Sequence, residues 1–357
     1  MRGDAVPADA LARVDADLFC ARAVDQGMLP LVADRLTGRT GVPARLLALL
    51  RKRADEAVAT DLVREAELKE LVAALDAAAV PAVFMKGSHL AYSHYPRPDL
   101  RPRIDTDVLI AADARARVDA LLARRGYERS SKVTGELVTG QSFYVKRRDG
   151  VVVHALDVHW KVSTPLVFAN VLSYDELMAG AVALPRLGGT ARGPSDVHAL
   201  LIACVHRVAH HQDSVVRLKW LYDVDLIARG LDDGGWKAFV ALAVERKVAA
   251  VCRRSLERAT EWFRTRVPEH VARELRIADA GAREVTAGYL TARPQAGALV
   301  DDLRTLGTWR QRGRLVRENL FPPADYMRRV YAPSSTMPLP ALYVWRFLRG
   351  ATKWLTR

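Results

Sequence analysis

The sequence has few cysteines and no long apolar run. Cys20, Cys204 and Cys252 are isolated from one another and odd in number among 357 residues. This pattern argues against structural zinc and is typical of a reducing compartment. The first residues lack the apolar stretch of a signal peptide, and no window approaches the ~18 uninterrupted apolar residues of a membrane span. We therefore expect a cytoplasmic protein without a membrane-spanning helix.

Acidic residues are scarce relative to basic ones. The chain holds 54 Lys and Arg against 41 Asp and Glu, which gives a formal net charge of +13. Such a balance favours an acidic partner, either a nucleotide, a nucleic acid or an anionic surface. The arginines are spread along nearly all of the expected helices and are not organised with an aromatic stacking platform. A basic protein that binds nucleic acid or an anionic membrane is therefore kept as an alternative.

Hydrophobic patterning divides the chain into three units. Residues 1–79 carry apolar side chains at helical spacing and predict a helical scaffold. Residues 80–172 are richer in β-branched residues and alternate between strand and helix patterns, as expected of a catalytic core. Residues 173–193 are punctuated by Gly and Pro and predict a linker. Residues 194–357 predict an all-helical domain, and half of the chain is hydrophobic, which is enough for a sizeable core.

The stretch around Gly87 has the pattern of a phosphate-binding turn. An apolar run over residues 80–85 ends at Gly87 and Ser88, and a helix-compatible segment follows. Glycine lets the backbone approach a phosphate, Ser88 can add a hydroxyl donor, and the amides of a helix N-terminus favour negative charge. Lys86 is a candidate phosphate contact, or else a solvated lysine at the end of a strand.

Two carboxylates occupy alternate positions in a predicted strand. Asp105 and Asp107 stand in a segment that ends with three apolar residues, 108–110. Because side chains alternate along a strand, both carboxylates point to one face. They repel each other unless a cation lies between them. Hard oxygen ligands suit Mg²⁺, which is usually held by one or two carboxylates plus substrate phosphates. The segment therefore predicts a site for Mg²⁺ or Mn²⁺.

A third carboxylate is available from a neighbouring strand. Asp157 stands in the β-branched run of residues 151–160. The preceding Asp149-Gly150 pair is a strong hairpin-turn signal, so Asp157 lies on the second arm of a hairpin and can sit beside the acidic strand. His159, two residues further on, faces the same side. It can orient a ligand, deprotonate an acceptor hydroxyl or make a structural hydrogen bond.

Together these motifs resemble the uncharacterised nucleotidyltransferase family within the DNA polymerase β superfamily. The resemblance rests on Lys86-Gly87-Ser88, on Arg101 and Arg103, on Asp105-x-Asp107 and on Asp157-Val158-His159-Trp160. A later helical pattern of the family is matched by His206, His210, Arg217, Leu218, Trp220 and Asp223. Thr106 replaces the apolar residue that is usual inside the acidic pair.

The resemblance implies a fold and a set of site residues. The expected fold is α+β: a small mixed β-sheet core of the polymerase β kind, with a helical N-terminal segment and an all-helical C-terminal domain. Gly87 and Ser88 would grip a nucleoside triphosphate, and Asp105, Asp107 and Asp157 would bind the metal ions. The candidate phosphate contacts are Lys86, Arg101, Arg103 and Lys219, although the two arginines can equally pair with carboxylates and Lys219 can equally make a surface ion pair.

The predicted activity is Mg²⁺-dependent nucleotidyl transfer. A nucleoside monophosphate would pass from a nucleoside triphosphate, with ATP as the expected donor, to an unknown acceptor with release of pyrophosphate. A small molecule or a protein ranks above RNA as the acceptor. The alternative is a non-catalytic nucleotide-binding or regulatory protein with the same fold. The sequence leaves the oligomeric state open.

Overall fold

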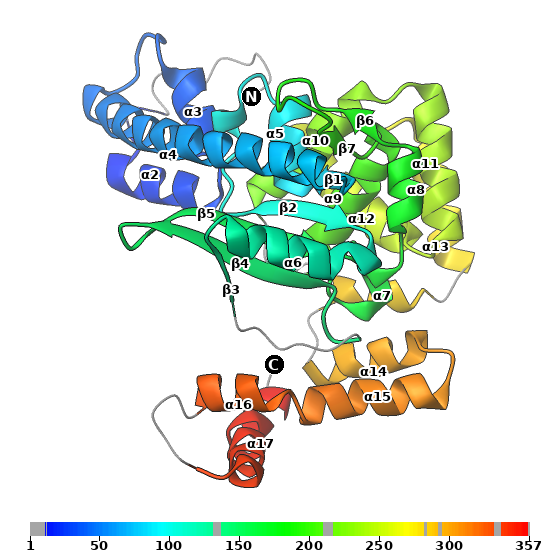
Figure 1. The fold of residues 1–357 in the computed structure, drawn as a ribbon. Coiled ribbons are helices and arrows are strands. Elements are labelled where there is room, and N and C mark those ends of the chain that lie inside the picture. The colour runs from blue at the N-terminus through cyan, green and yellow to red at the C-terminus, as the bar shows by residue number, and fades with distance from the viewer. Residues whose placement is uncertain are drawn as a thin grey trace.

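A seven-stranded mixed sheet lies at the centre of the computed structural model, with the strand order β3-β4-β5-β2-β1-β7-β6 (Figure 1). The structure describes residue 11 and residues 13–130, 137–209, 217–281, 284–291, 295–331 and 337–355. The strands are β1 (Ala82–Met85), β2 (Thr106–Ile110), β3 (Tyr127–Arg129), β4 (Gln141–Arg148), β5 (Val151–His159), β6 (Val182–Ala183) and β7 (Arg192–Gly193).

Helices precede, interrupt and follow the sheet, as the sequence predicts. Before it and between its strands are α2 (Ala16–Asp25), α3 (Leu29–Leu36), α4 (Ala44–Ala77), α5 (Lys86–Ser93), η1 (Pro98–Leu100), η2 (Ala112–Ala114), α6 (Arg115–Arg124), α7 (Leu166–Ala169) and α8 (Tyr174–Ala179). After it are α9 (Asp196–Ala209), α10 (Leu218–Gly230), α11 (Asp233–Glu245), α12 (Ala249–Phe263), α13 (Glu269–Gly281), η3 (Val285–Leu290), α14 (Gln295–Thr305), α15 (Trp309–Leu320), α16 (Ala324–Tyr331) and α17 (Leu339–Leu355).

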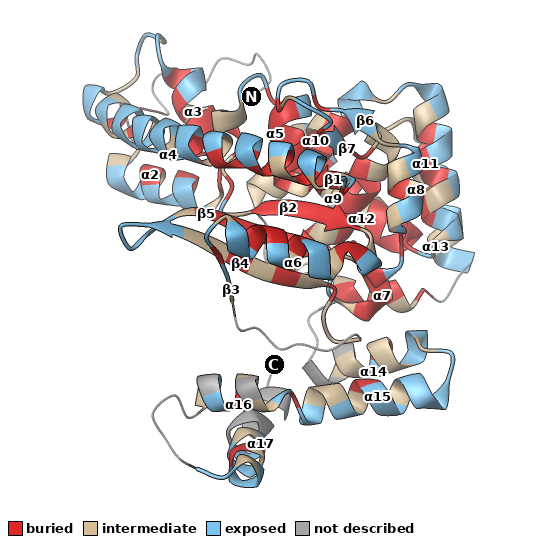
Figure 2. Ribbon diagram, viewed as in Figure 1, coloured by how far each residue is buried: buried red, intermediate tan, exposed pale blue. Residues whose placement is uncertain are grey.

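The two faces of the sheet bury separate cores, because successive side chains of a strand point to opposite faces. Phe84, Val108 and Leu156 pack on one face with apolar residues of α4 and α6. Met85 and Leu109 point to the other face and share a core with α9 to α13. Every residue of β2 is therefore buried, and Figure 2 shows this strand red along its length.

β4 and β5 form the hairpin that the sequence predicts. Arg148 pairs with Val151, so Asp149 and Gly150 are the two turn residues. Their φ angles of 51° and 77° are both positive, as a type I′ turn requires. Beyond the hairpin, β5 pairs with β2 in parallel. The expectation that the second arm lies beside the acidic strand is confirmed.

The segment 173–193 is more than the linker that its composition predicts. It contains α8, β6 and β7, and β7 pairs in parallel with β1 through Arg192 and Val83. Two strands therefore extend the sheet at one edge, in a segment whose Gly and Pro content predicts a loop. Each of these strands has only two residues, too few for an alternating pattern to be visible.

The described residues of the C-terminal part, from residue 194 onward, form helices joined by loops and no strand. Helices α9 to α13 share their core with the sheet, whereas α14 and α15 pack with α7 in a smaller cluster around Leu315, and α16 and α17 form another around Met327 and Leu342. Figure 1 shows α14 to α17 below the rest of the protein. Among the described residues, no helix combines the length and the apolar character needed to cross a bilayer.

A buried histidine connects three strands on the α4 and α6 side of the sheet. His154 of β5 has Nε2 2.9 Å from Thr106 Oγ1 and Nδ1 2.6 Å from the Tyr127 hydroxyl. Thr106 is thereby given a buried partner. Burial, together with the charges of Arg64 and Lys146, lowers the pKa of His154 to about 3.

Acid should destabilise the fold through this histidine. Between about pH 6.5 and pH 3 the unfolded chain binds a proton that the folded His154 does not, so stability falls as pH falls, by about 1.4 kcal/mol per pH unit for this one group. In urea denaturation from pH 4 to pH 7, the free energy of unfolding should change less steeply with pH in His154→Gln than in the wild type. Equal slopes would contradict the assignment. Burial also lowers the pKa of His89 to about 3, and this residue contributes equally to the pH dependence of both proteins.

Candidate active site

Two aspartates and a histidine come together where β2 and β5 lie side by side. The parallel register pairs Asp107 directly with Asp157, and His159 follows two residues later on the same face. All three are buried, and one ligand atom from each lies within 4.8 Å of the others. Their face of the sheet is the one that meets the C-terminal helices. This group is the candidate metal site among the described residues.

Asp105 lies just before β2 and outside this group of three. Its side chain lines the same cavity as Asp107 and Asp157. Burial and the nearby Asp107 carboxylate raise the pKa of Asp105. All three predicted metal ligands therefore face one space, but His159 stands closer to the pair than Asp105 does. The sequence signal for His159 was its place two residues after Asp157, for which orienting a ligand was one of three predicted roles.

The buried carboxylates already have cationic and hydrogen-bonding neighbours. The Lys86 ammonium donates to Asp107 Oδ1 at 2.6 Å, and His159 Nε2 lies 2.9 Å from the same oxygen. Burial works against ionisation of Asp107, but Lys86 and His159 hold its pKa below the usual range. Burial and the Lys86 charge also lower the pKa of His159. Gln141 Nε2 donates to Asp157 Oδ2 at 2.9 Å.

The predicted phosphate-binding turn is the direct junction of β1 with α5. Lys86 turns the chain with a φ of 51°, in the left-handed region that side chains rarely adopt. A Cβ at Gly87 would lie 3.3 Å from Arg103 Cγ, so this position favours glycine. The amides of the first turn have no partner within the helix. Ser88 is fully buried and outside the cavity wall, so its hydroxyl is not placed for the predicted contact.

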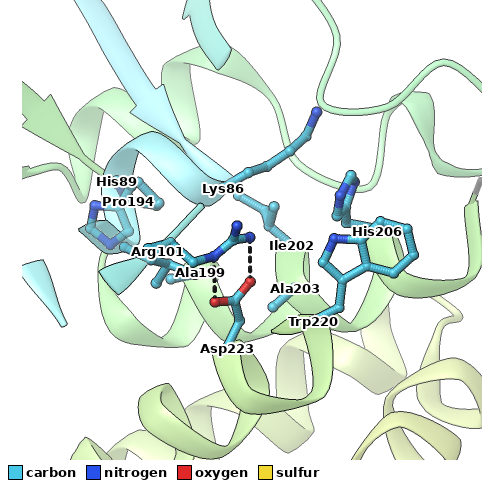
Figure 3. Close-up of a pocket in the computed structure, with 11 residues that line it drawn as sticks. Lys86, His89, Arg101, Pro194, Ala199, Ile202, Ala203, His206, Trp220 and Asp223 are labelled. Atoms are coloured by element: carbon cyan, nitrogen blue, oxygen red, sulfur yellow. Dashed lines mark hydrogen bonds and ion pairs between the residues drawn. The ribbon is translucent and has the colours of Figure 1, made fainter. Parts of the chain in front are cut away.

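The two predicted arginines anchor the loop that leads into β2. Arg101 donates through Nε and Nη2 to Asp223 of α10, at 2.8 and 2.6 Å, and the Tyr95 hydroxyl donates to the same carboxylate at 2.8 Å. Figure 3 shows this pair beneath Lys86. Arg103 pairs with the buried Asp61 of α4. Both arginines line the cavity, yet each is engaged by a carboxylate, which is one of the two roles that the sequence left open.

A cavity of about 330 Å³ lies in front of the carboxylates. Its wall is formed by Lys86, Gly87, Arg101, Pro102, Arg103, Ile104, Asp105, Asp107, Gln141, Asp157, His206, Arg217, Lys219 and Trp220. The last four come from α9 and the start of α10, so the C-terminal helices contribute one side of the space. Burial and the Arg101 charge lower the pKa of Lys219 to about 8.

The aromatic side chains of this wall are Trp220 and His206. Their ring centroids are 5.2 Å apart in an edge-to-face arrangement, and the Arg217 guanidinium carbon lies 5.8 Å from the Trp220 ring centroid. Both rings also border a small cavity of about 20 Å³ between α5 and α9, which is drawn in Figure 3. The sequence indicates both residues chiefly through the family resemblance, because the spacing of His206 and His210 lacks a third metal ligand and does not point to a site on the sheet. Of the six residues in that pattern, His210 lies outside the described part of the chain.

The fold and the site together define a class of protein. A strand that passes directly into a helix start, beside two adjacent strands that carry paired aspartates, is consistent with a nucleotidyltransferase fold. The chain belongs to an uncharacterised nucleotidyltransferase family, whose sequence pattern matches residues 12–264. The DNA polymerase β superfamily is consistent with this placement. No curated protein matches the chain.

Removal of the Asp223 charge should destabilise the protein because it leaves the buried Arg101 guanidinium without its carboxylate. Breaking a buried ion pair typically costs about 3–5 kcal/mol. Asp223→Asn should therefore lower the free energy of unfolding by about 3 kcal/mol in urea denaturation. Asp34→Asn is the matched control, because its pair with Arg97 is half exposed and should be worth less than about 1 kcal/mol. Equal losses in the two variants would contradict the anchoring role.

Proposed function

We propose that the protein transfers a nucleoside monophosphate from a nucleoside triphosphate, with ATP as the expected donor, to an acceptor, with release of pyrophosphate. The observation that carries the proposal is the pairing of Asp107 with Asp157 across β2 and β5, beside the start of α5. Family membership supports the general reaction class. The acceptor would be a hydroxyl or phosphate group of a small molecule or a protein.

The residues of the site fit a divalent cation. Carboxylate oxygens suit Mg²⁺ or Mn²⁺, and Asp107 and Asp157 would hold the ion, with Asp105 facing the same cavity. His159 Nε2 lies against Asp107 and can fix the orientation of that carboxylate, as partners of metal ligands do. When bound, such an ion would stabilise charge on the transferred phosphoryl group and lower the pKa of the acceptor.

The remaining parts of the site would position the triphosphate. The amides at the start of α5, which have no partner within the helix, and the helix dipole attract phosphate oxygens. Lys86, Lys219 and Arg217 add positive charge from two sides of the cavity. These groups would supply positioning and charge neutralisation, which account for most of the rate in reactions of this kind.

The shape of the wall supports a small-molecule or protein acceptor. Binding of single-stranded nucleic acid uses several aromatic surfaces on which successive bases stack. The cavity wall, as far as the structure describes it, offers Trp220 with His206 at its edge, which is a surface for one planar group. A single nucleotide base fills that role, so the acceptor is not required to be a nucleic acid.

Nucleotide binding should depend on both the metal and the aspartates. Thermal stability of the wild type should rise with one or more nucleoside triphosphates in the presence of Mg²⁺ or Mn²⁺. A ligand at a hundredfold excess over its dissociation constant adds about 2.7 kcal/mol. The metal-dependent part of the rise should be lost in Asp107→Asn and in Asp157→Asn. Asp149→Asn is the control, because asparagine also suits the turn at that position.

The same proteins should be assayed for pyrophosphate release with mixtures of small molecules and proteins as acceptors. Release by the wild type and by Asp149→Asn, but not by the two site variants, is the expected result. Metal-independent stabilisation, or stabilisation that persists in Asp107→Asn and Asp157→Asn, would contradict the assigned site. Stabilisation without pyrophosphate release from any acceptor would favour the non-catalytic alternative.

A further inference from the structure

One lysine lies directly against the candidate metal ligands. The Lys86 ammonium donates to Asp107 Oδ1 at 2.6 Å and lies 3.5 Å from His159 Nε2, and the side chain is only 12% exposed. Two clustered carboxylates require a nearby positive charge to remain ionised when buried. Lys86 meets this requirement from within the chain.

This lysine and a divalent ion would be in conflict. An ion held by Asp107 and Asp157 would share the Asp107 carboxylate with the ammonium, only a few ångströms away. Two cations at that distance repel each other strongly in a buried site, where screening by water is weak. The ammonium occupies the Asp107 oxygen that the ion would also bind, so one of the two cations must leave that oxygen.

A bound triphosphate would offer the lysine a second place. Lys86 is the first residue of α5, so the root of its side chain lies in the same helical turn whose free amides are the candidate phosphate site. The side chain lines the main cavity, and also the small cavity behind it. Its flexible four-carbon stem can carry the charge from Asp107 to a phosphate oxygen without a change of backbone.

We propose that Lys86 is an internal cation that competes with the free metal ion for Asp107 and that moves to the triphosphate when metal and nucleotide are bound together. The proposal rests on the proposed function, because the metal–triphosphate complex is its ligand. Lys86 is then a positioning residue that makes the binding of metal and of nucleotide mutually dependent. A site of this kind binds the free ion weakly and the metal–nucleotide complex tightly.

Lys219 provides the matched comparison. It is the other lysine in the cavity wall, but its Nζ donates to the Pro102 carbonyl at 3.4 Å, and no contact with Asp107 is found in the described structure. Removing either lysine takes one positive charge from the cavity. Only the removal of Lys86 also removes the competitor for the Asp107 oxygen.

The test is the binding of Mn²⁺, followed by electron paramagnetic resonance of the free ion, to the full-length protein without nucleotide. Lys86→Met should bind Mn²⁺ at least tenfold more tightly than the wild type, and Lys219→Met should stay within about threefold of it. Lys86→Arg keeps the charge and should remain as weak as the wild type. Methionine and arginine meet the same backbone restriction as lysine at a φ of 51°, so the three proteins carry equal strain there.

A second titration should include a non-hydrolysable ATP analogue. The analogue should tighten Mn²⁺ binding at least tenfold in the wild type and less than threefold in Lys86→Met, and Lys86→Met should bind the analogue itself more weakly. Unchanged or weaker nucleotide-free Mn²⁺ binding in Lys86→Met would overturn the inference, as would an equal gain in Lys219→Met. Asp107→Asn distinguishes a failure of the metal site from a failure of the role proposed for Lys86. If the wild type binds no Mn²⁺ even with the analogue, or if Asp107→Asn binds as the wild type does, the metal site itself is wrong and the inference falls with it.

Discussion

The parallel pairing of β2 with β5 is the constraint on which the site depends. It sets Asp107 beside Asp157 on a face of the sheet that is otherwise used for packing, and both carboxylates are buried. Buried like charges are unfavourable unless positive charge and hydrogen-bond donors are near. These demands are met by Lys86, Gln141 and His159, which contact the two carboxylates. The start of α5 and the loop before β2 are therefore best understood as parts of one electrostatic arrangement.

The helical segments on either side are tied into the same arrangement. The loop that leads into β2 carries Arg101 and Arg103, and each is held by a buried aspartate from a different unit: Asp223 from α10 and Asp61 from α4. The family match, which runs from residue 12 to residue 264, takes in both of these helices with the sheet. The N-terminal and C-terminal helices thus fix the approach to the acidic strand, in addition to covering the sheet.

Local sequence signals predicted the parts of the fold that are decided locally. The Asp149-Gly150 turn follows from backbone preference, and the place of Asp157 next to the acidic strand follows from the hairpin. Contacts between distant segments could not be read in the same way. Nothing near Arg101 indicates that its partner is a residue of α10, more than a hundred positions away, and the two-residue strand β7 has no pattern to detect. In the candidate site, alternation placed the aspartates on one face, whereas for Lys219 of α10 the sequence left a phosphate contact and a surface ion pair equally open.

Ser88 shows how the start of a helix can be predicted a residue or two too late from the sequence. The sequence placed a turn at Gly87-Ser88, whereas the helix already begins at Lys86, so Ser88 falls within the first turn and its side chain is buried. What the position offers is a backbone amide, which any residue would supply. At this junction the side chain that lines the cavity is that of Lys86.

Two histidines of β5 show why position alone does not assign a role. His154 and His159 are five residues apart and therefore point to opposite faces of the same strand. Burial lowers the pKa of both rings. His154 is enclosed by Thr106 and Tyr127 and serves the fold, whereas His159 lies against Asp107 in the candidate metal site. The chemistry of each histidine follows from the face it occupies, and that face is set by the register of the strand, which is also what brings the two aspartates together.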